Sequence, residues 1–414
     1  MKIYNNEKFE LIKTYIKWCF ISVLVGIILG LVGVSFHYSI DISAKLFSGN
    51  RIFLFLLPVA GAIIPLMYKL AGMEKDVGTN MAILSIRENQ NISIKTAPLI
   101  FISTVLTHLT GGSAGREGAA LQLGSSIGGF IGKIFKLDQY DKKIITMCGM
   151  SAAFAALFGT PITASIFAIE MIGVGVMHYS ALVPCTVSAI IAALVARFFN
   201  VPPAFFALKT IPELTIINLL KIIVLSALCA LISIVFCFTI HYVGKIYKKI
   251  PNTILRGAIG GVIVLVTSLL LGTNDYNGAG MSVISRAISG EAFPLAFLIK
   301  IALTAMTLGA GFKGGEIVPT FFTGATFGCV AASFIGIDNG FGAAIGLISL
   351  FCGVTNCPLA SIFLSLELFG EKGIIFFAIA CATSFMLSGY SGLYNEQIIT
   401  YSKTKPIFIN RKAD

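Results

Sequence analysis

Apolar runs of membrane-spanning length recur along this chain, and they limit the folds open to it more than any other feature. Trp18 to Phe36 and Leu219 to Ile240 reach that length, and Ile52 to Met67 and Ala258 to Leu271 are shorter. A spanning helix needs about 20 apolar residues. Charged residues make up only 12% of the 414 residues, against about a quarter in soluble domains. The sequence therefore predicts an all-α integral membrane protein with several passes.

The net charge of +11 is spread over loops and tails. Sixteen of the 30 lysines and arginines fall in Lys2 to Lys17, Lys133 to Lys143, Lys245 to Arg256 and Lys403 to Lys412. Basic residues collect on the cytoplasmic side of membrane proteins. We therefore predict a plasma-membrane protein with both termini in the cytoplasm and no nucleic-acid partner. The first apolar run lacks a small-residue cleavage site, so we expect a retained helix rather than a signal peptide.

Several apolar segments are interrupted by glycine or proline at membrane depth. Ala97 to Leu109 ends in the glycines of residues 111–118, and Leu295 to Leu308 ends in those of residues 309–315. Such breaks are tolerated where the backbone is buried in protein or lines a cavity. Paired broken helices in two halves of a chain indicate the binding site of a transporter.

The two halves of the chain repeat each other at an offset of 197 residues. Pro161 precedes Glu170 by nine residues, as Pro358 precedes Glu367. The repeat by itself leaves a parallel or an inverted relationship open. We divide the chain into an N-terminal cytoplasmic tail, two membrane repeats and a C-terminal cytoplasmic tail, at residues 1–14, 15–210, 211–400 and 401–414.

The strongest local motif is the glycine-rich segment 111–118, which contains Arg116 and Glu117. The apolar stretch Ala119 to Phe130 follows, and its composition predicts a helix. The N-terminus of that helix presents free N–H groups and the positive end of the helix dipole, which together form an anion site. The Glu117 carboxylate is itself an anion at this site, so a halide displaces it and protonation releases it. The alternative is a helix cap paired with Arg116.

The second half has the same pattern in residues 311–319. Lys313 and Glu316 follow glycines, and Pro319 suits the first turn of a helix. Two helix N-termini are therefore expected to converge on one anion. An ionised Glu316 would repel that anion, so this carboxyl is expected to be neutral, hydrogen-bonded or part of a proton path. The alternative is a pair with Lys313.

With these two motifs, the chain resembles the CLC family of anion channels and anion/proton antiporters. Gly115-Arg-Glu-Gly118 matches its G-R-E-G motif, whose glutamate is the external gate. Gly315-Glu-Ile-Val-Pro319 is similar to its G-x-F-x-P motif, with Ile317 in place of phenylalanine. Ser391-Gly-Leu-Tyr394 resembles the segment of its central tyrosine, whose hydroxyl contributes to the inner anion site. The similarity extends over about residues 15–400.

The resemblance implies a CLC-like fold of two repeated, inverted halves with many short, broken, tilted helices. It implies a homodimer in the lipid bilayer with one pore per subunit and no cofactor. Glu117 and Glu316 are the expected gating and proton-coupling residues. The expected anion-binding residues are Gly78, Thr79, Asn80, Arg116, Gly118, Ile317, Val318 and Tyr394.

Departures from the family pattern bear on which anion is carried. Chloride-type members have G-S-G-I-P, whose serine binds the anion, where this chain has Val-Gly-Thr-Asn-Met at residues 77–81. Met171 stands where chloride exchangers carry an internal glutamate. Both changes, and Glu316, are similar to the fluoride-exporting branch, although Val318 replaces its threonine. We predict fluoride export in exchange for protons, with chloride/proton exchange or a passive chloride or fluoride channel as alternatives.

The remaining polar and aromatic residues carry weaker expectations. Glu170 and Glu367 are expected to cap or pair within the fold, and His108 to form a structural hydrogen bond rather than relay protons. Phe321 and Phe322 are candidates for ring-edge contact with a halide. The sequence has no H-E-x-x-H, G-x-S-x-G or Walker motif and no cluster of metal ligands. It predicts neither an enzyme nor a metal site.

Overall fold

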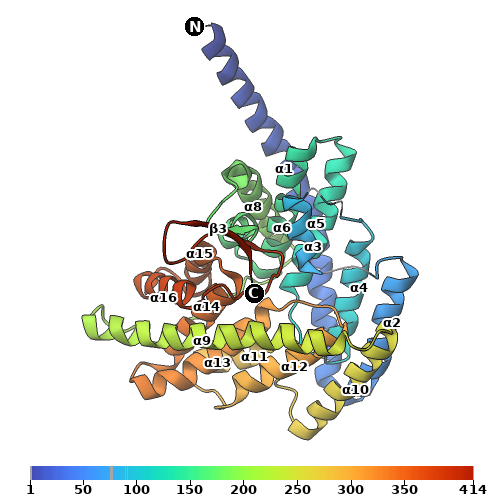
Figure 1. The fold of residues 1–414 in the computed structure, drawn as a ribbon, viewed down its shortest axis with the longest axis vertical. Helices are drawn as coiled ribbons and strands as arrows, with labels where there is room; N and C mark the ends of the chain where they lie inside the picture. The colour runs from blue at the N-terminus through green and yellow to red at the C-terminus, as the bar shows by residue number, and fades with distance from the viewer. Residues whose placement is uncertain (1, 75–77, 89, 91, 414) are drawn as a thin grey trace.

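The described residues form a helical fold (Figure 1). They comprise two sets of eight α-helices. The structure is a computed structural model, and it describes residues 2–74, 78–88, 90 and 92–413. Two 3₁₀ helices, η1 (Arg51–Leu56) and η2 (Tyr179–Ala181), precede α2 and α8. The helices of the first set are α1 (Lys2–Gly49), α2 (Leu57–Leu70), α3 (Thr79–Arg87), α4 (Thr96–Leu109), α5 (Glu117–Ile134), α6 (Gln139–Phe158), α7 (Pro161–Glu170) and α8 (Leu182–Phe198).

The second set repeats the order of long and short helices found in the first. The shortest helices, α3 and α11, take the third place in each set, and proline begins the seventh helix, α7 or α15. The second set consists of α9 (Ile216–Tyr247), α10 (Thr253–Leu271), α11 (Met281–Ile288), α12 (Ala296–Ala310), α13 (Ile317–Ile335), α14 (Asn339–Thr355), α15 (Pro358–Phe369) and α16 (Ile374–Leu387).

Within the described residues, six helical segments are long and apolar enough to cross a membrane. Their burial differs widely. The apolar stretch of α13 is 78% buried, whereas that of α10 is 28% buried. Helix α13 therefore lies at the centre of the fold, and α10 lies at its edge, where apolar side chains such as Leu270 are exposed as expected of a lipid-facing surface.

Matched glycines allow the central helices of each half to pack closely. A Cβ atom added to Gly124 of α5 would lie 2.2 Å from the carbonyl oxygen of Gly149 in α6. A Cβ atom added to Gly324 of α13 would lie 2.4 Å from the carbonyl oxygen of Gly346 in α14. Small residues let backbones approach in membrane helices. The sequence repeat is thus a repeat of helix packing.

Two glutamates tie the halves together reciprocally. The carboxylate of Glu170, at the end of α7, accepts hydrogen bonds from the N–H groups of residues 359–360 in α15, at 3.1 and 2.8 Å. The carboxylate of Glu367 in α15 accepts from the N–H groups of residues 162–163 in α7, at 2.9 and 2.8 Å. The capping role expected for both glutamates is confirmed. Their reciprocity indicates an approximate two-fold axis between the halves.

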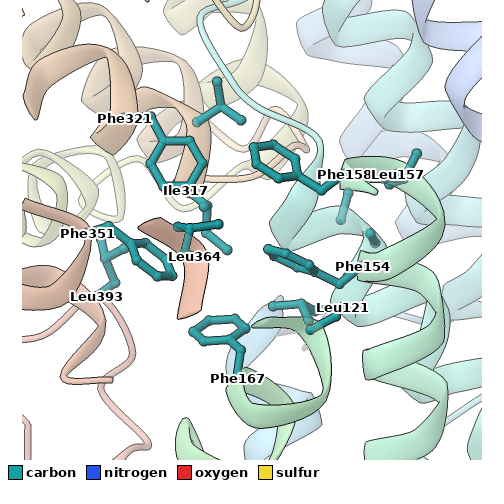
Figure 2. Close-up of a cluster of buried hydrophobic side chains, with 14 of the residues drawn as sticks. Leu121, Phe154, Leu157, Phe158, Phe167, Ile317, Phe321, Phe351, Leu364 and Leu393 are labelled. Atoms are coloured by element: carbon teal, nitrogen blue, oxygen red, sulfur yellow. The ribbon is translucent and has the colours of Figure 1, made fainter. Parts of the chain in front are cut away.

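Aromatic rings fill the space between the halves (Figure 2). Phe158 of α6 lies with its ring centroid 5.6 Å from that of Phe321 in α13, which in turn lies 5.3 Å from that of Phe351 in α14. Phe167 of α7 contacts both Phe154 and Phe351, with centroids 5.6 Å apart in each pair. Phe321 is therefore a core residue at the interface of the two repeats.

A three-stranded sheet, not expected from the sequence, accompanies the helices. Strand β1 (Gly173–Val174) pairs in parallel with β2 (Ile398–Tyr401), which pairs antiparallel with β3 (Phe408–Lys412). The sheet holds the C-terminal segment against the end of α7. At the other end of the chain, residues 2–14 form the beginning of α1.

Candidate functional site

The site is built where the glycine-rich loops of the two halves meet. The N–H group of Gly115 donates to the carbonyl oxygen of Gly315 at 2.7 Å, and the N–H group of Gly315 donates to that of Gly115 at 2.8 Å. Each loop leads directly into a helix, α5 at Glu117 and α13 at Ile317. The expected convergence of two helix N-termini is therefore present in the fold.

Both helices begin with N–H groups that precede the first helical hydrogen bond. That bond runs from Ala120 to Arg116 in α5 and from Thr320 to Glu316 in α13. A Cβ atom added to Gly315 would lie 2.5 Å from the backbone nitrogen of Gly118, so only glycine allows this approach. The loops bring backbone donors close together, as an anion site requires.

The Glu117 side chain folds back over the start of its own helix. It is 1% exposed, and its Oε2 accepts a hydrogen bond from the Arg116 N–H group at 3.0 Å. The Arg116 Nε lies 3.7 Å from Glu117 Oε1, and Arg116 Nη1 lies 3.0 Å from Nδ1 of His37 in α1. A Cβ atom on Gly115 would lie 3.0 Å from Glu117 Oε2. The carboxylate thus lies inside the protein, at the junction of the two loops.

Glu316 lies on the neighbouring side of the same junction. Its Oε2 has no hydrogen-bond partner among the described residues, and it lies 3.0 Å from the position of a Cβ atom added to Gly118. Lys313 is not its partner. The Lys313 Nζ lies over the ring of Tyr68, 4.3 Å from the centroid. The Glu316 side chain is therefore half-buried, with its Oε2 atom enclosed and without an ion pair in the described part of the chain.

A cavity of about 690 Å³ leads to Glu316. Five of the residues predicted for the site line it: Gly78, Thr79, Asn80, Glu316 and Tyr394. Tyr394 is 2% exposed, and its hydroxyl has no hydrogen-bond partner among the described residues. Buried polar groups are normally hydrogen-bonded, so the unpaired oxygens of Glu316 and Tyr394 suit a site that takes up a polar or ionic guest.

The start of α3 supplies further polar groups. The Thr79 hydroxyl donates to the carbonyl oxygen of Gly118 at 3.4 Å, which joins α3 to α5. The Asn80 Oδ1 accepts from the N–H group of Glu396 at 3.2 Å, which joins α3 to the segment that carries Tyr394. Val77, the first residue of the stretch compared with G-S-G-I-P, lies outside the described residues.

The other predicted anion-binding residues do not line this cavity. Gly118 adjoins it through Thr79, and Arg116 lies at the junction beside Glu117. The side chains of Ile317 and Val318 are 0% and 1% exposed and belong to the apolar core, so their contribution is limited to backbone N–H groups.

Two of the remaining candidates, His108 and Phe322, lie in buried surroundings. The His108 Nδ1 lies 2.9 Å from the carbonyl oxygen of Thr104, which confirms the expected structural hydrogen bond. The Phe322 ring is buried beneath Lys300, whose Nζ lies 5.2 Å from the ring centroid.

Several polar residues of the site were not predicted from the sequence. Gln122 of α5 lines the cavity. The sequence feature that could have identified it is a polar amide side chain within the apolar stretch that begins at Ala119. His37 contacts Arg116 from a helix 79 positions away, and no local pattern indicates this. The cavity lining also includes three bases, Lys248, Arg256 and Lys313, three acids, Glu74, Glu316 and Glu396, and His241.

A membrane-spanning helical fold with two converging broken helices and a buried polar cavity defines a membrane transport protein. A family model described as "Voltage gated chloride channel" matches residues 59–389. The chain belongs to this family, the CLC family. The resemblance and the helical fold predicted from the sequence are thereby confirmed.

Relatives and solved structures agree with this assignment. A chloride/fluoride channel protein of Pseudomonas syringae pv. tomato is 33% identical over 410 residues, covering 97% of this chain and 91% of its own. The crystal structure of a CLC-type fluoride/proton antiporter superposes with a TM-score of 0.89 at 30% identity, covering 92% of this chain and 97% of that one. A slow cyanobacterial Cl⁻/H⁺ antiporter shares the fold, with a TM-score of 0.78 at 18% identity, 89% of this chain and 93% of that one being covered.

Proposed function

We propose that this protein exports fluoride in exchange for protons. The observation that carries the proposal is the Glu117 carboxylate, buried at the N-terminus of α5 beside the junction of Gly115 and Gly315. A halide competes for the place of this carboxylate. Protonation removes its charge, so the side chain leaves the site while the halide occupies it. One residue thus alternates between the anion path and the proton path.

Glu316 extends the proton path toward the cavity. An ionised carboxyl would repel an anion held by Thr79 and Tyr394, so Glu316 is neutral when the anion is present. Its unpaired Oε2 lies close to Gly118, at the start of the helix that carries Glu117. The two glutamates act in the same cycle, Glu117 as the gate and Glu316 as the inner proton carrier.

Fluoride is favoured over chloride by the donors around the cavity. Fluoride holds its hydration shell strongly, so its site must supply strong hydrogen-bond donors. The hydroxyl groups of Thr79 and Tyr394 and the Asn80 amide supply them in the cavity lining. The N–H groups of residues 317–318 and the Arg116 charge add donors at the adjoining junction of the two loops. The fluoride/proton antiporter with the same fold supports this choice.

Two alternative functions, chloride/proton exchange and passive anion conduction, are compatible with the same fold. A chloride/proton exchanger would use the same glutamates. A passive anion channel is favoured by Met171, which is buried and offers no acid at the position of the internal proton glutamate, and by the relative described as a channel. Flux measurements separate the three.

The orientation in the membrane follows from charge. The Lys17 Nζ pairs with Asp141, which places the first part of α1 beside the basic loop between α5 and α6. Following the positive-inside rule, we place this side and both termini in the cytoplasm and the protein in the plasma membrane. Residues 1–14 and 401–414 are the proposed tails, 15–210 and 211–400 the proposed repeats, and the assembly is a homodimer in the bilayer with one pore per subunit.

The test is transport by purified protein in liposomes. Vesicles loaded with fluoride, with the membrane potential clamped, are diluted into fluoride-free buffer at equal pH. Fluoride efflux should acidify the lumen, because each step brings protons inward. Fluoride efflux without acidification would show a passive channel. Faster acidification with chloride than with fluoride would show a chloride exchanger.

A further inference from the structure

Gln122 places a carboxamide beside the proposed anion site, one turn beyond Gly118 in α5. Its side chain is 5% exposed and lines the same cavity as Thr79, Glu316 and Tyr394. The helix around it is apolar and tightly buried. A buried amide in such a helix needs partners for two N–H donors and for one carbonyl oxygen.

The protein supplies these partners poorly. The Nε2 group donates to Thr79 Oγ1 at 3.3 Å and to the carbonyl oxygen of Gly118 at 3.4 Å, both longer than a typical hydrogen bond. Oε1 has no hydrogen-bond partner among the described residues. A Cβ atom added to Gly78 would lie 3.7 Å from Nε2, so no side chain separates this amide from the start of α3.

The Glu316 carboxyl lies close to Gly118, which also contacts Gln122. A Cβ atom added to Gly118 would lie 3.0 Å from Glu316 Oε2 and 3.4 Å from Thr79 Oγ1. Gln122 approaches Gly118 and Thr79 through its Nε2. Two buried oxygens without partners, Glu316 Oε2 and Gln122 Oε1, therefore line one cavity close to one hydroxyl donor.

We propose that Gln122 determines anion selectivity, because its Nε2 donates to the transported fluoride beside Thr79 while its Oε1 accepts the proton of a neutral Glu316. An amide serves both roles at once, since its two ends are a donor and an acceptor. A neutral Glu316 and a bound fluoride are then stabilised together. The inference rests on the proposed fluoride/proton exchange and adds one residue to it.

The test replaces Gln122 by methionine, which has nearly the same length and no N–H donor. Fluoride and chloride efflux are measured from liposomes, together with luminal acidification. Losing one hydrogen bond to an ion should lower the ratio of fluoride to chloride flux about tenfold or more. The number of protons per fluoride should fall as well, because Glu316 loses its acceptor.

Ser125→Ala is the matched control. Ser125 is buried in the same helix, and its hydroxyl donates to the backbone oxygen of Gln122 instead of lining the cavity. This variant should keep the wild-type flux ratio. If Gln122→Met does not yield folded protein, Gln122→Asn takes its place, because it shortens the side chain by one methylene and withdraws the amide from the site. The same two quantities are measured, the ratio of fluoride to chloride flux and the number of protons per fluoride.

The results separate this inference from the function it rests on. A folded Gln122 variant whose flux ratio and proton coupling equal those of the wild type overturns it. A parallel loss of fluoride and chloride flux also overturns it, because that shows a structural role alone. Wild-type protein that moves fluoride without protons refutes the proposed exchange, and the flux ratio of Gln122→Met still decides whether the amide binds the anion.

Discussion

Gly115 and Gly315 exchange two backbone hydrogen bonds across the centre of the molecule, at 2.7 and 2.8 Å. Each glycine lies two residues before the start of its helix, α5 at Glu117 or α13 at Ile317, and their segments run antiparallel. This pair places the start of α5 against the start of α13. Glu117 and Glu316 owe their proximity to this contact, because each lies within two residues of one of the glycines.

Replacing Gly315 by alanine should separate the two helix starts. The added Cβ atom would lie 2.5 Å from the backbone nitrogen of Gly118 and 3.1 Å from that of Glu117, and backbone has little freedom to yield. We expect a loss of about 1–3 kcal/mol in the free energy of unfolding. Fluoride flux should fall about tenfold or more, since the site depends on geometry. Denaturant titration and liposome flux measure the two effects.

Gly129→Ala provides the comparison for this substitution. Gly129 lies in α5, and the nearest atom to its added Cβ is the Thr146 Oγ1 at 3.9 Å. It should therefore leave flux unchanged and leave stability unchanged or slightly higher, because alanine favours a helix. Equal behaviour of the two alanine variants would show that close approach at Gly315 is not required.

Removing the carboxylate of Glu367 should weaken the fold without changing the coupling ratio. Glu367→Ala leaves the N–H groups of residues 162–163, at the start of α7, without their carboxylate acceptor, at a cost of about 1.5–3 kcal/mol. Glu170→Ala, the corresponding substitution in the first repeat, should lower the stability in the same way, because it removes the acceptor of two N–H groups at the start of α15. Unfolding titrations measure the stability, and liposome assays measure protons moved per fluoride. A changed ratio in folded Glu367→Ala would place this residue in the proton path.

The C-terminal sheet should become more stable as the pH rises from about 8 to 10.5. Lys403, between β2 and β3, donates to Asn356 Oδ1 and Ser388 Oγ and lies over the ring of Phe385, and burial lowers the pKa of its ammonium group from 10.5 to about 8. Between these values the unfolded chain binds the proton and the folded chain does not, so folding is favoured by rising pH.

Hydrogen exchange of residues 398–412 across this pH range, corrected for the intrinsic pH dependence of exchange, tests the Lys403 prediction. Lys403→Met removes the titrating group, so protection in this variant should vary less with pH than in the wild type. Equal pH profiles in the two proteins would show that Lys403 does not link protonation to the stability of the sheet.

Much of the helical framework was predictable because glycine, proline and apolar runs mark helix ends locally. Ala97 to Leu109 became α4, which begins one residue earlier, and Pro161 and Pro358 begin α7 and α15. The proline-to-glutamate spacing of the repeat also predicted matched roles for Glu170 and Glu367. These features depend on residues close together in the sequence.

Features that depend on tertiary contact were not predictable in the same way. The reciprocal direction of the two glutamate caps, each on the other repeat, requires the two-fold arrangement of the halves. The Arg116 contact with His37 joins residues 79 positions apart. The strands β2 and β3 carry no strong alternating pattern, and they form because residue Gln397 and its neighbours fold back onto the core.

The central claim is that one carboxylate serves both the anion path and the proton path. Glu117→Gln, measured in fluoride-loaded liposomes, tests it most directly, because the amide keeps the size of the side chain and can neither ionise nor carry a proton. We predict that fluoride still leaves the vesicles while the lumen no longer acidifies. Proton uptake per fluoride equal to that of the wild type would contradict the claim.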